Sequence, residues 1–585
     1  MPTNIRRFGL AAAATSLALG TCVVTAGTAN ADASFDFTRI EGANRYLTSV
    51  NAAEAFGKAD TVILASGESG RYPDALTANY LAGIKGAPVL LTRKDQTPEE
   101  VKKAISDAGA KTIIIVGGED VVSKAQEDSL KGTYAVKRLA GDNRYATAAA
   151  VIAEGDTAPV STALLATGRN FPDALGAGPV AFAEKMPLAI TDTDDAPDNV
   201  VQALRDAGIN KVLVLGGKTA VSEAVVNELK AKGISVEKRF DGADRAETST
   251  LLAQHAVDNF GFSKTAVNVA SGYNNGGGAD ALSGAPLTGK AERALLITRS
   301  NTTAGDSIVA YLKKHAATLT EGVIFGGDAA LAKSVEYSLE KVVLGSGAQN
   351  TKTGELYDTV QAAVDEAQTG DTVTVFGADN AGFTVAKPIT VVGEEGAKLT
   401  GGVTIRGVDG VTIADLTITP SNQGGEIAGV YLDNAEGVTI KDNVIAGTGK
   451  ASGARGVINA VGGEKEIATI SGNSISAVTT GVFSNPSAEF TVTGNEFRQN
   501  AAGVGTDEKA VIKNNRFVNN DEGIGLGAAG STVEGNYFAN QVDHHVKDWT
   551  TAPADKYDLA AMIQANTFDE PVVVNETNRT IVDQS

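Results

Sequence analysis

Three arginines and three aspartates recur at matching positions in the first half of the chain, and their side chains have the clearest capacity for chemistry. They are Arg45, Arg144 and Arg245, each ahead of a helical stretch, and Asp74, Asp173 and Asp280, each after an apolar run. A guanidinium can bind phosphate or carboxylate through two parallel hydrogen bonds. The arginines therefore either contact an anionic ligand or pair with the aspartate of the same module. The sequence leaves both possibilities open.

Paired glycines are the second recurring feature. Each pair lies between an apolar run and a helical stretch: Gly117 and Gly118, Gly216 and Gly217, Gly326 and Gly327. Backbone amides at such a place can hold an anion. The pairs lack the longer dinucleotide fingerprint, however, so a tight strand-to-helix turn is the simpler interpretation. Together with the arginines and aspartates, these glycines form the tentative binding site.

All of these residues lie in a threefold repeat. Its opening motif reads RIEGANRYLT from Arg39, RLAGDNRYAT from Arg138 and RFDGADRAET from Arg239. Each opening is followed by three apolar runs of strand length that alternate with amphipathic helical stretches. This alternation predicts three α/β modules with parallel sheets inside. We place the modules at residues 34–137, 138–238 and 239–343, followed by a linker at 344–353.

The second half, residues 354–585, has a shorter period of about twenty residues. One series consists of Asn443, Asn473, Asn495, Asn515 and Asn536, and a parallel series consists of Gly429, Gly456, Gly481, Gly503 and Gly523. Such a pattern predicts the coils of a solenoid with short strands in separate parallel sheets. Because asparagine tolerates left-handed backbone, we expect it at the bends, with the side chains bonded coil over coil. A helix from Thr359 is expected to cap the first coil.

The repeated motifs of the first half resemble the type-two cell-wall-binding repeat of exported Gram-positive surface proteins. The resemblance implies three Rossmann-like modules in a pseudo-threefold arrangement, attached noncovalently to an anionic secondary cell-wall polymer. That polymer would be the ligand of the tentative site. The third copy departs from the pattern, with Arg293 in place of a proline, Ala246 in place of the tyrosine seen at Tyr46 and Tyr145, and Ala279 in place of the proline seen at Pro73 and Pro172.

The second half is similar to the right-handed parallel β-helix of pectate-lyase-like proteins, on the strength of phrases such as GDTVTV and GVTI. The resemblance implies the fold of this domain. It leaves the chemistry open, because that fold serves lyases, hydrolases, epimerases and adhesins alike.

The amino terminus predicts export. Arg6 and Arg7 precede an apolar stretch that ends at Ala29, Asn30 and Ala31, which is the build of a cleaved signal peptide over residues 1–31. An uncleaved anchor and a lipid on Cys22 are the alternatives. Cleavage would remove the only cysteine and change the formal charge from -20 to -22, because the two arginines are lost. A surface of that charge disfavours nucleic acid as a partner.

Catalytic residues are not predicted in the solenoid. Its charged residues Asp415, Asp433, Asp442, Asp507, Arg406, Arg455, Arg498 and Arg516 are scattered, mostly at turns, and adjacent His544 and His545 would point to opposite faces of a strand. His255 and His315 lie in helical stretches without a nucleophile motif. We therefore expect no metal and no cofactor. The leading hypothesis is a non-enzymatic surface protein whose solenoid binds a host or environmental polysaccharide; the alternatives are a polysaccharide lyase or hydrolase, and a surface-layer component.

Overall fold

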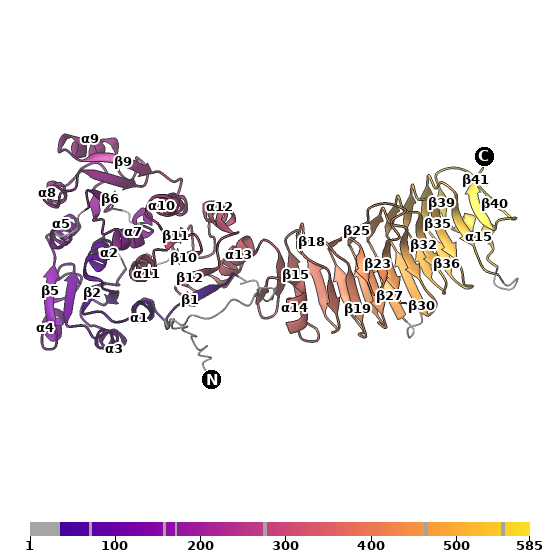
Figure 1. The fold of residues 1–585 in the computed structure, drawn as a ribbon, viewed down its shortest axis with the longest axis horizontal. Coiled ribbons are helices and arrows are strands. Elements are labelled where there is room, and N and C mark those ends of the chain that lie inside the picture. Colours follow the sequence, from indigo (N-terminus) through magenta and orange to yellow (C-terminus); the bar gives the residue numbers. More distant parts are fainter. Residues whose placement is uncertain are drawn as a thin grey trace, which may run out of the picture. The chain divides into compact units, whose positions relative to one another are not determined.

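The computed structural model describes residues 35–69, 73–155, 160–169, 172–272, 278–460, 466–551 and 556–584. The predicted signal peptide and Cys22 lie outside this range. Figure 1 shows an α/β half and an all-β half, as the sequence predicts.

Three four-stranded parallel sheets form the α/β half. Three strands of each sheet come from the apolar runs of one module and are largely buried, whereas the fourth, at one edge, is more polar and more exposed. The first sheet, in the order β3-β2-β4-β5, contains β2 (Thr61–Ser66), β3 (Val89–Thr92), β4 (Thr112–Val116) and β5 (Ala135–Leu139). The second, β7-β6-β8-β9, contains β6 (Thr162–Thr167), β7 (Leu188–Thr191), β8 (Lys211–Leu215) and β9 (Ser235–Phe240). The third, β11-β10-β12-β1, contains β10 (Ala266–Ser271), β11 (Ala294–Thr298), β12 (Glu321–Phe325) and β1 (Phe37–Ile40).

Helices connect the strands of each sheet, as expected for parallel pairs. The first module has α1 (Arg45–Phe56), α2 (Pro73–Lys85), α3 (Glu99–Ala108) and α4 (Lys124–Lys131). The second has α5 (Arg144–Glu154), α6 (Pro172–Leu175), α7 (Gly178–Ala183), α8 (Asp198–Asp206) and α9 (Glu223–Ala231). The third has α10 (Arg245–Asn259), α11 (Ala279–Lys290), α12 (Asp306–His315) and α13 (Lys333–Leu344).

Sheet membership is shifted by one strand relative to the sequence repeat. Strands β5 and β9, which carry the opening arginines Arg138 and Arg239, belong to the sheet of the module before them. The opening strand of the first repeat, β1, pairs with β12 in the sheet of the third module. The predicted boundaries at 138 and 239 thus follow the repeat, whereas the folded units exchange their opening strands in a closed ring.

The three modules share one core. Helices α2, α7 and α11 contact one another, and their buried side chains, among them Leu81, Val180 and Leu282, belong to a single hydrophobic cluster. Gly178 permits this close approach, because a Cβ there would lie 2.5 Å from the Cβ of Ala285. The modules therefore form one body rather than independent beads (Figure 1).

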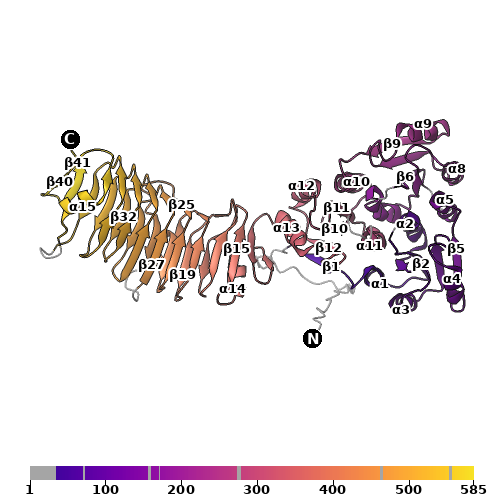
Figure 2. The ribbon, with the colours of Figure 1, turned by 180° about the vertical axis from the view of Figure 1, so that it is seen from behind.

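The second half is a stack of β-coils whose strands line three long sheets (Figures 1 and 2). The ten-stranded sheet contains β13 (Gly347–Asn350), β14 (Leu356–Tyr357), β15 (Thr372–Phe376), β17 (Thr390–Gly393), β20 (Thr412–Ala414), β24 (Val438–Lys441), β27 (Glu466–Ser471), β30 (Ala488–Thr493), β33 (Val511–Lys513) and β36 (Thr532–Glu534). The eight-stranded sheet contains β18 (Lys398–Leu399), β21 (Thr417–Ile418), β25 (Val444–Ala446), β28 (Ser474–Ser476), β31 (Glu496–Arg498), β34 (Arg516–Val518), β37 (Tyr537–Ala539) and β39 (Thr567–Phe568).

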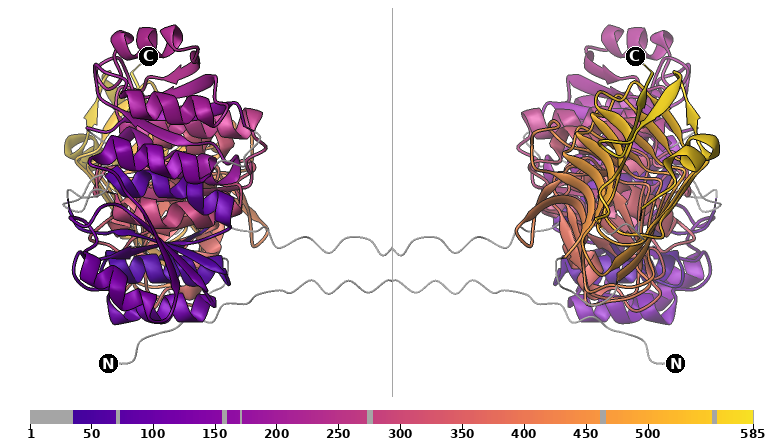
Figure 3. Two further views of the ribbon diagram at one scale, coloured as in Figure 1. Left: turned by 90° about the vertical axis from the view of Figure 1, so that its left-hand side faces the viewer. Right: turned by 90° about the vertical axis from the view of Figure 1, so that its right-hand side faces the viewer.

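The 11-stranded sheet contains β16 (Phe383–Val385), β19 (Val403–Arg406), β22 (Ser421–Gln423), β23 (Glu426–Asp433), β26 (Arg455–Asn459), β29 (Thr480–Ser484), β32 (Ala502–Thr506), β35 (Glu522–Leu526), β38 (His544–Asp548), β40 (Val572–Asn575) and β41 (Thr580–Asp583). Helix α14 (Val360–Glu366) buries Val360, Ala363 and Val364 in the core of the first coils, and α15 (Leu559–Ala565) lies near the last ones. The right-hand view of Figure 3 shows successive coils overlapping.

The predicted linker at 344–353 is partly wrong. Gly347–Asn350 form β13, which pairs antiparallel with β14 and β15. Ala348 on this strand is fully buried in the β-helix core. The polar and glycine-rich composition concealed this strand, because Ala348 is its only apolar side chain.

The asparagine series is confirmed as a ladder. Each side chain bonds to the next coil: the backbone N–H and the Nδ2 of Asn473 donate to Oδ1 of Asn495 at 2.9 Å, and Asn495 repeats this with Asn515. The expected left-handed backbone at these asparagines is wrong, however. The residues with left-handed backbone are those directly before the ladder, such as Asp442 and Asn514, with φ near 58° and 57°.

The glycine series has a steric cause. A Cβ on Gly481, Gly503 or Gly523 would lie 2.5 to 2.8 Å from the ring of Phe497, Phe517 or Phe538 respectively. These rings stack coil over coil, with centroids 4.9 to 5.0 Å apart. Glycine is therefore required where these strands pass close to the aromatic stack.

Candidate functional site

The repeated arginines stand at helix starts because the residue before each one is an N-cap. Asn44 accepts from the backbone N–H groups of Tyr46 and Leu47, and Asn143 caps α5 in the same way. Asp244 caps α10 by accepting from the backbone N–H of Glu247. The cap directs Arg45 to the carboxyl end of β2, where its Nη1 donates to the Gly67 carbonyl at 2.7 Å. Arg144 and Arg245 donate to the equivalent carbonyls of Gly168 and Gly272.

Each aspartate faces the arginine of the neighbouring module, and the three pairings close a ring. Asp74 faces Arg144 and Thr147, Asp173 faces Arg245 and Thr248, and Asp280 faces Arg45 and Thr48. We call each of these groups of three residues a seam. The alternative that each arginine pairs with the aspartate of its own module is therefore wrong. The aspartate belongs to the preceding module of the ring, because each first helix packs against that module's central helices.

Burial dominates the electrostatics of the seams. It raises the pKa of Asp74, Asp173 and Asp280, and the facing arginines and threonines offset part of this rise. The effect requires deep burial, and Asp280 is only 8% exposed. Burial of the seam carboxylates thus disfavours their ionisation, and the neighbouring arginines and threonines favour their ionisation.

The paired glycines lie against carboxylates of the protein itself. A Cβ on Gly117 would lie 3.1 Å from Oδ2 of Asp74, and one on Gly216 would lie 2.6 Å from Oδ2 of Asp173. A Cβ on Gly217 would lie 2.3 Å from Oδ1 of Asp241. Gly326 has the same relation to Asp280, Gly327 to Glu41, and Gly118 has open space around it. A side chain on the first glycine of each pair would thus crowd the seam aspartate, and one on Gly217 or Gly327 would crowd a carboxylate outside the seams. Gly118 is under no such constraint.

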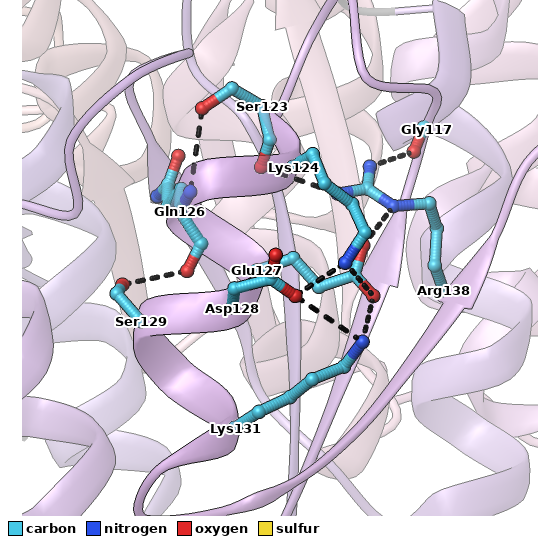
Figure 4. Close-up of polar contacts among 9 residues, drawn as sticks. All are labelled: Gly117, Ser123, Lys124, Gln126, Glu127, Asp128, Ser129, Lys131 and Arg138. Atoms are coloured by element: carbon cyan, nitrogen blue, oxygen red, sulfur yellow. Dashed lines mark hydrogen bonds and ion pairs between the residues drawn. The ribbon is translucent and has the colours of Figure 1, made fainter.

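Sequence reasoning missed a second set of repeated arginines, the first residues of the opening motifs. Figure 4 shows one of them, Arg138, whose Nη1 donates to the carbonyl of Gly117 at 2.7 Å and whose Nε donates to Glu127 at 2.7 Å. Arg39 and Arg239 donate in the same way to Gly326 and Gly216. Their recurrence as the first letter of each motif was the available signal.

These opening arginines bind carboxylates of different burial. Lys131, Arg138 and Lys124 surround Glu127 and lower its pKa to about 2, and the Lys131 hydrogen bond is the largest cause (Figure 4). Glu336, the partner of Arg39, is 5% exposed, whereas Glu223, which lies 4.0 Å from Arg239, is 53% exposed.

In the β-helix the predicted charged residues do not gather. Arg406 pairs with Asp433 at 2.8 Å, and Arg498 and Arg516 both pair with Glu496. Asp415 and Asp442 occupy exposed turn positions with left-handed backbone, and Asp507 is exposed at the end of β32. Among the described residues these side chains form ion pairs and solvated edges on separate coils.

Two shallow cavities lie away from the seams. One of about 230 Å³ lies between α1 and α3 and is lined by Ala53, Glu54, Gly57, Lys58, Ala104, Asp107 and Ala108. The other, of about 340 Å³, lies beside the β22–β23 hairpin and is lined by Thr419, Pro420, Ser421, Asn422, Ile427, Gly447, Thr448, Ser452 and Ala454. Neither contains a residue of the tentative site.

Comparison with known families explains the threefold organisation. Residues 39–127, 138–226 and 239–336 match the model of cell wall binding domain 2. The α/β half consists of three cell wall binding repeats. Residues 364–565 match the model described as periplasmic copper-binding protein (NosD). The repeats make this chain a cell-wall or cell-surface protein, and no helix among its described residues is long and apolar enough to cross a membrane.

Curated relatives share part of the chain. N-acetylmuramoyl-L-alanine amidase LytC of Bacillus subtilis (strain 168) is 31% identical over 312 residues, which cover 52% of this chain and 58% of the amidase. The amidase enhancer of the same organism is 31% identical over 309 residues, which cover 52% of this chain and 40% of the enhancer. The chain thus spans about half the length of these relatives.

Two solved structures resemble the chain. Cwp6 from Clostridium difficile has a TM-score of 0.46 and 22% identity, covering 60% of this chain and 51% of its own. Cwp8 from the same organism has a TM-score of 0.47 and 25% identity, covering 53% of this chain and 52% of its own.

The residues of the β-helix do not fit the copper site that the second family's name suggests. Copper prefers imidazole and sulfur ligands. His545 lies among the rings of Phe538 and Phe568 and bonds to Asp583 at 2.7 Å, whereas His544 faces Glu522 at 3.5 Å. The described part of the chain holds no group of three His, Cys, Asp or Glu able to bind a metal ion. The match to this family therefore reflects the repeated coils of the β-helix, and we do not assign copper binding to this chain.

Proposed function

We propose that this chain is an exported Gram-positive surface protein whose three modules hold it noncovalently on an anionic secondary cell-wall polymer, while the β-helix is presented for glycan binding or adhesion. The observation that carries the anchor is the threefold cell wall binding repeat. Three equivalent seams on one rigid body give a repeating polymer three equivalent places to bind, so weak contacts add up.

We place the polymer at the carboxyl edge of the three sheets, where ligands of parallel α/β sheets usually bind. Arg45, Arg144 and Arg245 lie at this edge, partly exposed. Of the facing aspartates, Asp280 is buried and Asp74 and Asp173 are half-buried, so the polymer would approach the arginines from solvent. The formal charge of -20 makes long-range attraction of a polyanion unfavourable, and short-range hydrogen bonds must therefore supply the affinity.

The test is sedimentation of the mature chain with Gram-positive wall sacculi before and after extraction of their anionic polymers. We expect binding to the untreated sacculi and its loss after extraction. Equal binding to both would refute an anionic polymer as the ligand.

A triple substitution of Arg45, Arg144 and Arg245 by glutamine tests the role of the arginines, with exposed Arg205→Gln on α8 as the control. Weaker sedimentation with unchanged thermal unfolding would support a ligand contact. Unchanged sedimentation with lower thermal stability would assign the arginines to the seams alone.

A further inference from the structure

One row of residues on the 11-stranded sheet faces away from the β-helix core. The row runs through Phe483, Gly505, Gly525 and Lys547, which are in register on β29, β32, β35 and β38. Their neighbours in sequence, Val482, Val504, Ile524 and Val546, are at most 1% exposed and point into the core. Because side chains alternate along a strand, the row lies on the outer face.

The two glycines of this row lie beneath aromatic rings. A Cβ on Gly505 would lie 2.8 Å from Cδ2 of Phe483, and one on Gly525 would lie 3.2 to 3.4 Å from three atoms of the Trp549 ring. Glycine inside a strand costs roughly 0.5 to 1 kcal/mol and often marks a place of close approach. Gly505 and Gly525 lie on successive coils. Without side chains there, the rings of Phe483 and Trp549 lie directly on the sheet, over neighbouring coils.

Trp549 remains exposed although it rests on the sheet. The residue is 40% exposed, and it is the only tryptophan in the sequence. Cations flank both rings: Lys547 Nζ lies 5.5 Å from the Trp549 ring, and the Arg455 guanidinium lies 5.8 Å from the Phe483 ring. An exposed, braced tryptophan beside polar groups is typical of binding sites rather than of plain surface.

The polar groups around the rings are balanced in charge. Arg455 donates to Glu426 at 2.9 Å, and Glu522 faces His544 at 3.5 Å while also lying near Lys547. Such paired groups can donate hydrogen bonds to ligand hydroxyls and accept them, and they produce no strong electrostatic potential of one sign. Phe483 packs on one side against the buried side chains of Tyr431 and Ile458. The exposed apolar residues described elsewhere on the β-helix are scattered singly, so the rings do not belong to the broad exposed apolar patch that a protein partner requires.

We propose that Phe483 and Trp549 form an aromatic platform that binds a neutral polysaccharide along the stack of coils. The apolar faces of sugar rings stack on the two aromatic rings, and the sugar hydroxyls bond to the charged groups beside them. A chain of sugars can contact successive coils, because both the polymer and the sheet repeat in one direction. This site rests on the proposed role of the β-helix in glycan binding and is independent of the wall anchor.

The sole tryptophan makes the test direct, because all tryptophan emission of the full chain reports this one position. The emission is recorded during titration with mannan, dextran, galactan and cello-oligosaccharides, with polygalacturonate as the anionic comparison. We expect a saturable change with at least one neutral glycan and none with polygalacturonate. No response to any neutral glycan, or a response to polygalacturonate alone, would overturn the proposal.

Variants separate the platform from glycan binding elsewhere on the chain. Retardation in native gels containing the responding glycan is compared for Trp549→Ala, Phe483→Leu and the control Val573→Ala, an exposed apolar residue on β40. We expect about tenfold or greater weakening for Trp549→Ala, weaker binding for Phe483→Leu, and no change for the control. Unchanged retardation of both platform variants, with unchanged thermal unfolding, would reject this site while leaving glycan binding by the β-helix standing.

Discussion

The opening arginines allow a graded prediction, because the same side chain meets three carboxylates of different burial. We predict that alanine at Arg39 destabilises the α/β half more than alanine at Arg138, and that Arg239→Ala has the smallest effect. The order follows the exposure of the partner carboxylates, which is 5% for Glu336, 9% for Glu127 and 53% for the partner of Arg239.

Arg39→Ala breaks a buried pair. The guanidinium is 7% exposed and donates through Nε to Glu336 at 2.9 Å, and through Nη1 to the carbonyls of Gly326 at 2.7 Å and Leu331 at 3.1 Å. Removing one partner of a buried ion pair costs about 3 to 5 kcal/mol. Lys333 remains 3.1 Å from Glu336, which places the expected cost near the lower value.

Arg239→Ala breaks a pair whose carboxylate is exposed to solvent. Its distance to Glu223 is 4.0 Å, and a pair of this kind contributes about 0 to 1 kcal/mol. The hydrogen bonds to the carbonyls of Gly216 and Val221 have counterparts at Arg39, so they cancel in the comparison. The difference between the two variants is then about 2 to 3 kcal/mol.

Urea unfolding followed by far-ultraviolet circular dichroism measures this difference, since the single tryptophan reports only on the β-helix. A loss for Arg239→Ala equal to that for Arg39→Ala would refute the reasoning, because carboxylate burial would then not control the cost. Hydrogen exchange of β1 should also accelerate in Arg39→Ala, since this arginine ties the opening strand to the third module.

Three further predictions concern charge and the ladder. Glu127 has a pKa lowered to about 2, so its contribution to stability is present above its ordinary pKa of 4.5 and is lost as pH falls toward 2. Glu127→Gln should therefore reduce the change of the melting temperature with pH over that interval. Burial raises the pKa of Asp280 above 3.8, so its contribution is full below that value and is lost as pH rises through the raised one; Asp280→Asn should reduce the decline of urea stability above pH 3.8. Asn495→Ala removes four ladder hydrogen bonds with neighbouring coils and should cost the β-helix about 3 to 5 kcal/mol in tryptophan-monitored unfolding, whereas exposed Asn578→Ala should cost almost nothing.

The repeat periods predicted both halves of the fold, because each period reflects one physical unit. Alternating apolar runs and helical stretches specified the parallel sheets, and stacked asparagines specified the coils. The strand β13 was missed because its glycine and polar residues carry little apolar signal.

The partners within the tentative site could not be predicted from one repeat. Arg144 is as compatible in sequence with Asp173 of its own module as with Asp74 of the previous one, and only the packing of α5 against α2 decides between them. The left-handed residue before each ladder asparagine was likewise hidden, because Asp, Asn and Gly all occupy it. The aromatic platform was hidden because Phe483 and Trp549 are far apart in sequence and meet glycines on other coils.

The most direct measurement of the central claim is sedimentation of the protein with wall sacculi before and after removal of their anionic polymers. The account predicts that the protein sediments with intact sacculi and stays in solution with extracted ones. Equal sedimentation with both, or none with either, would contradict it.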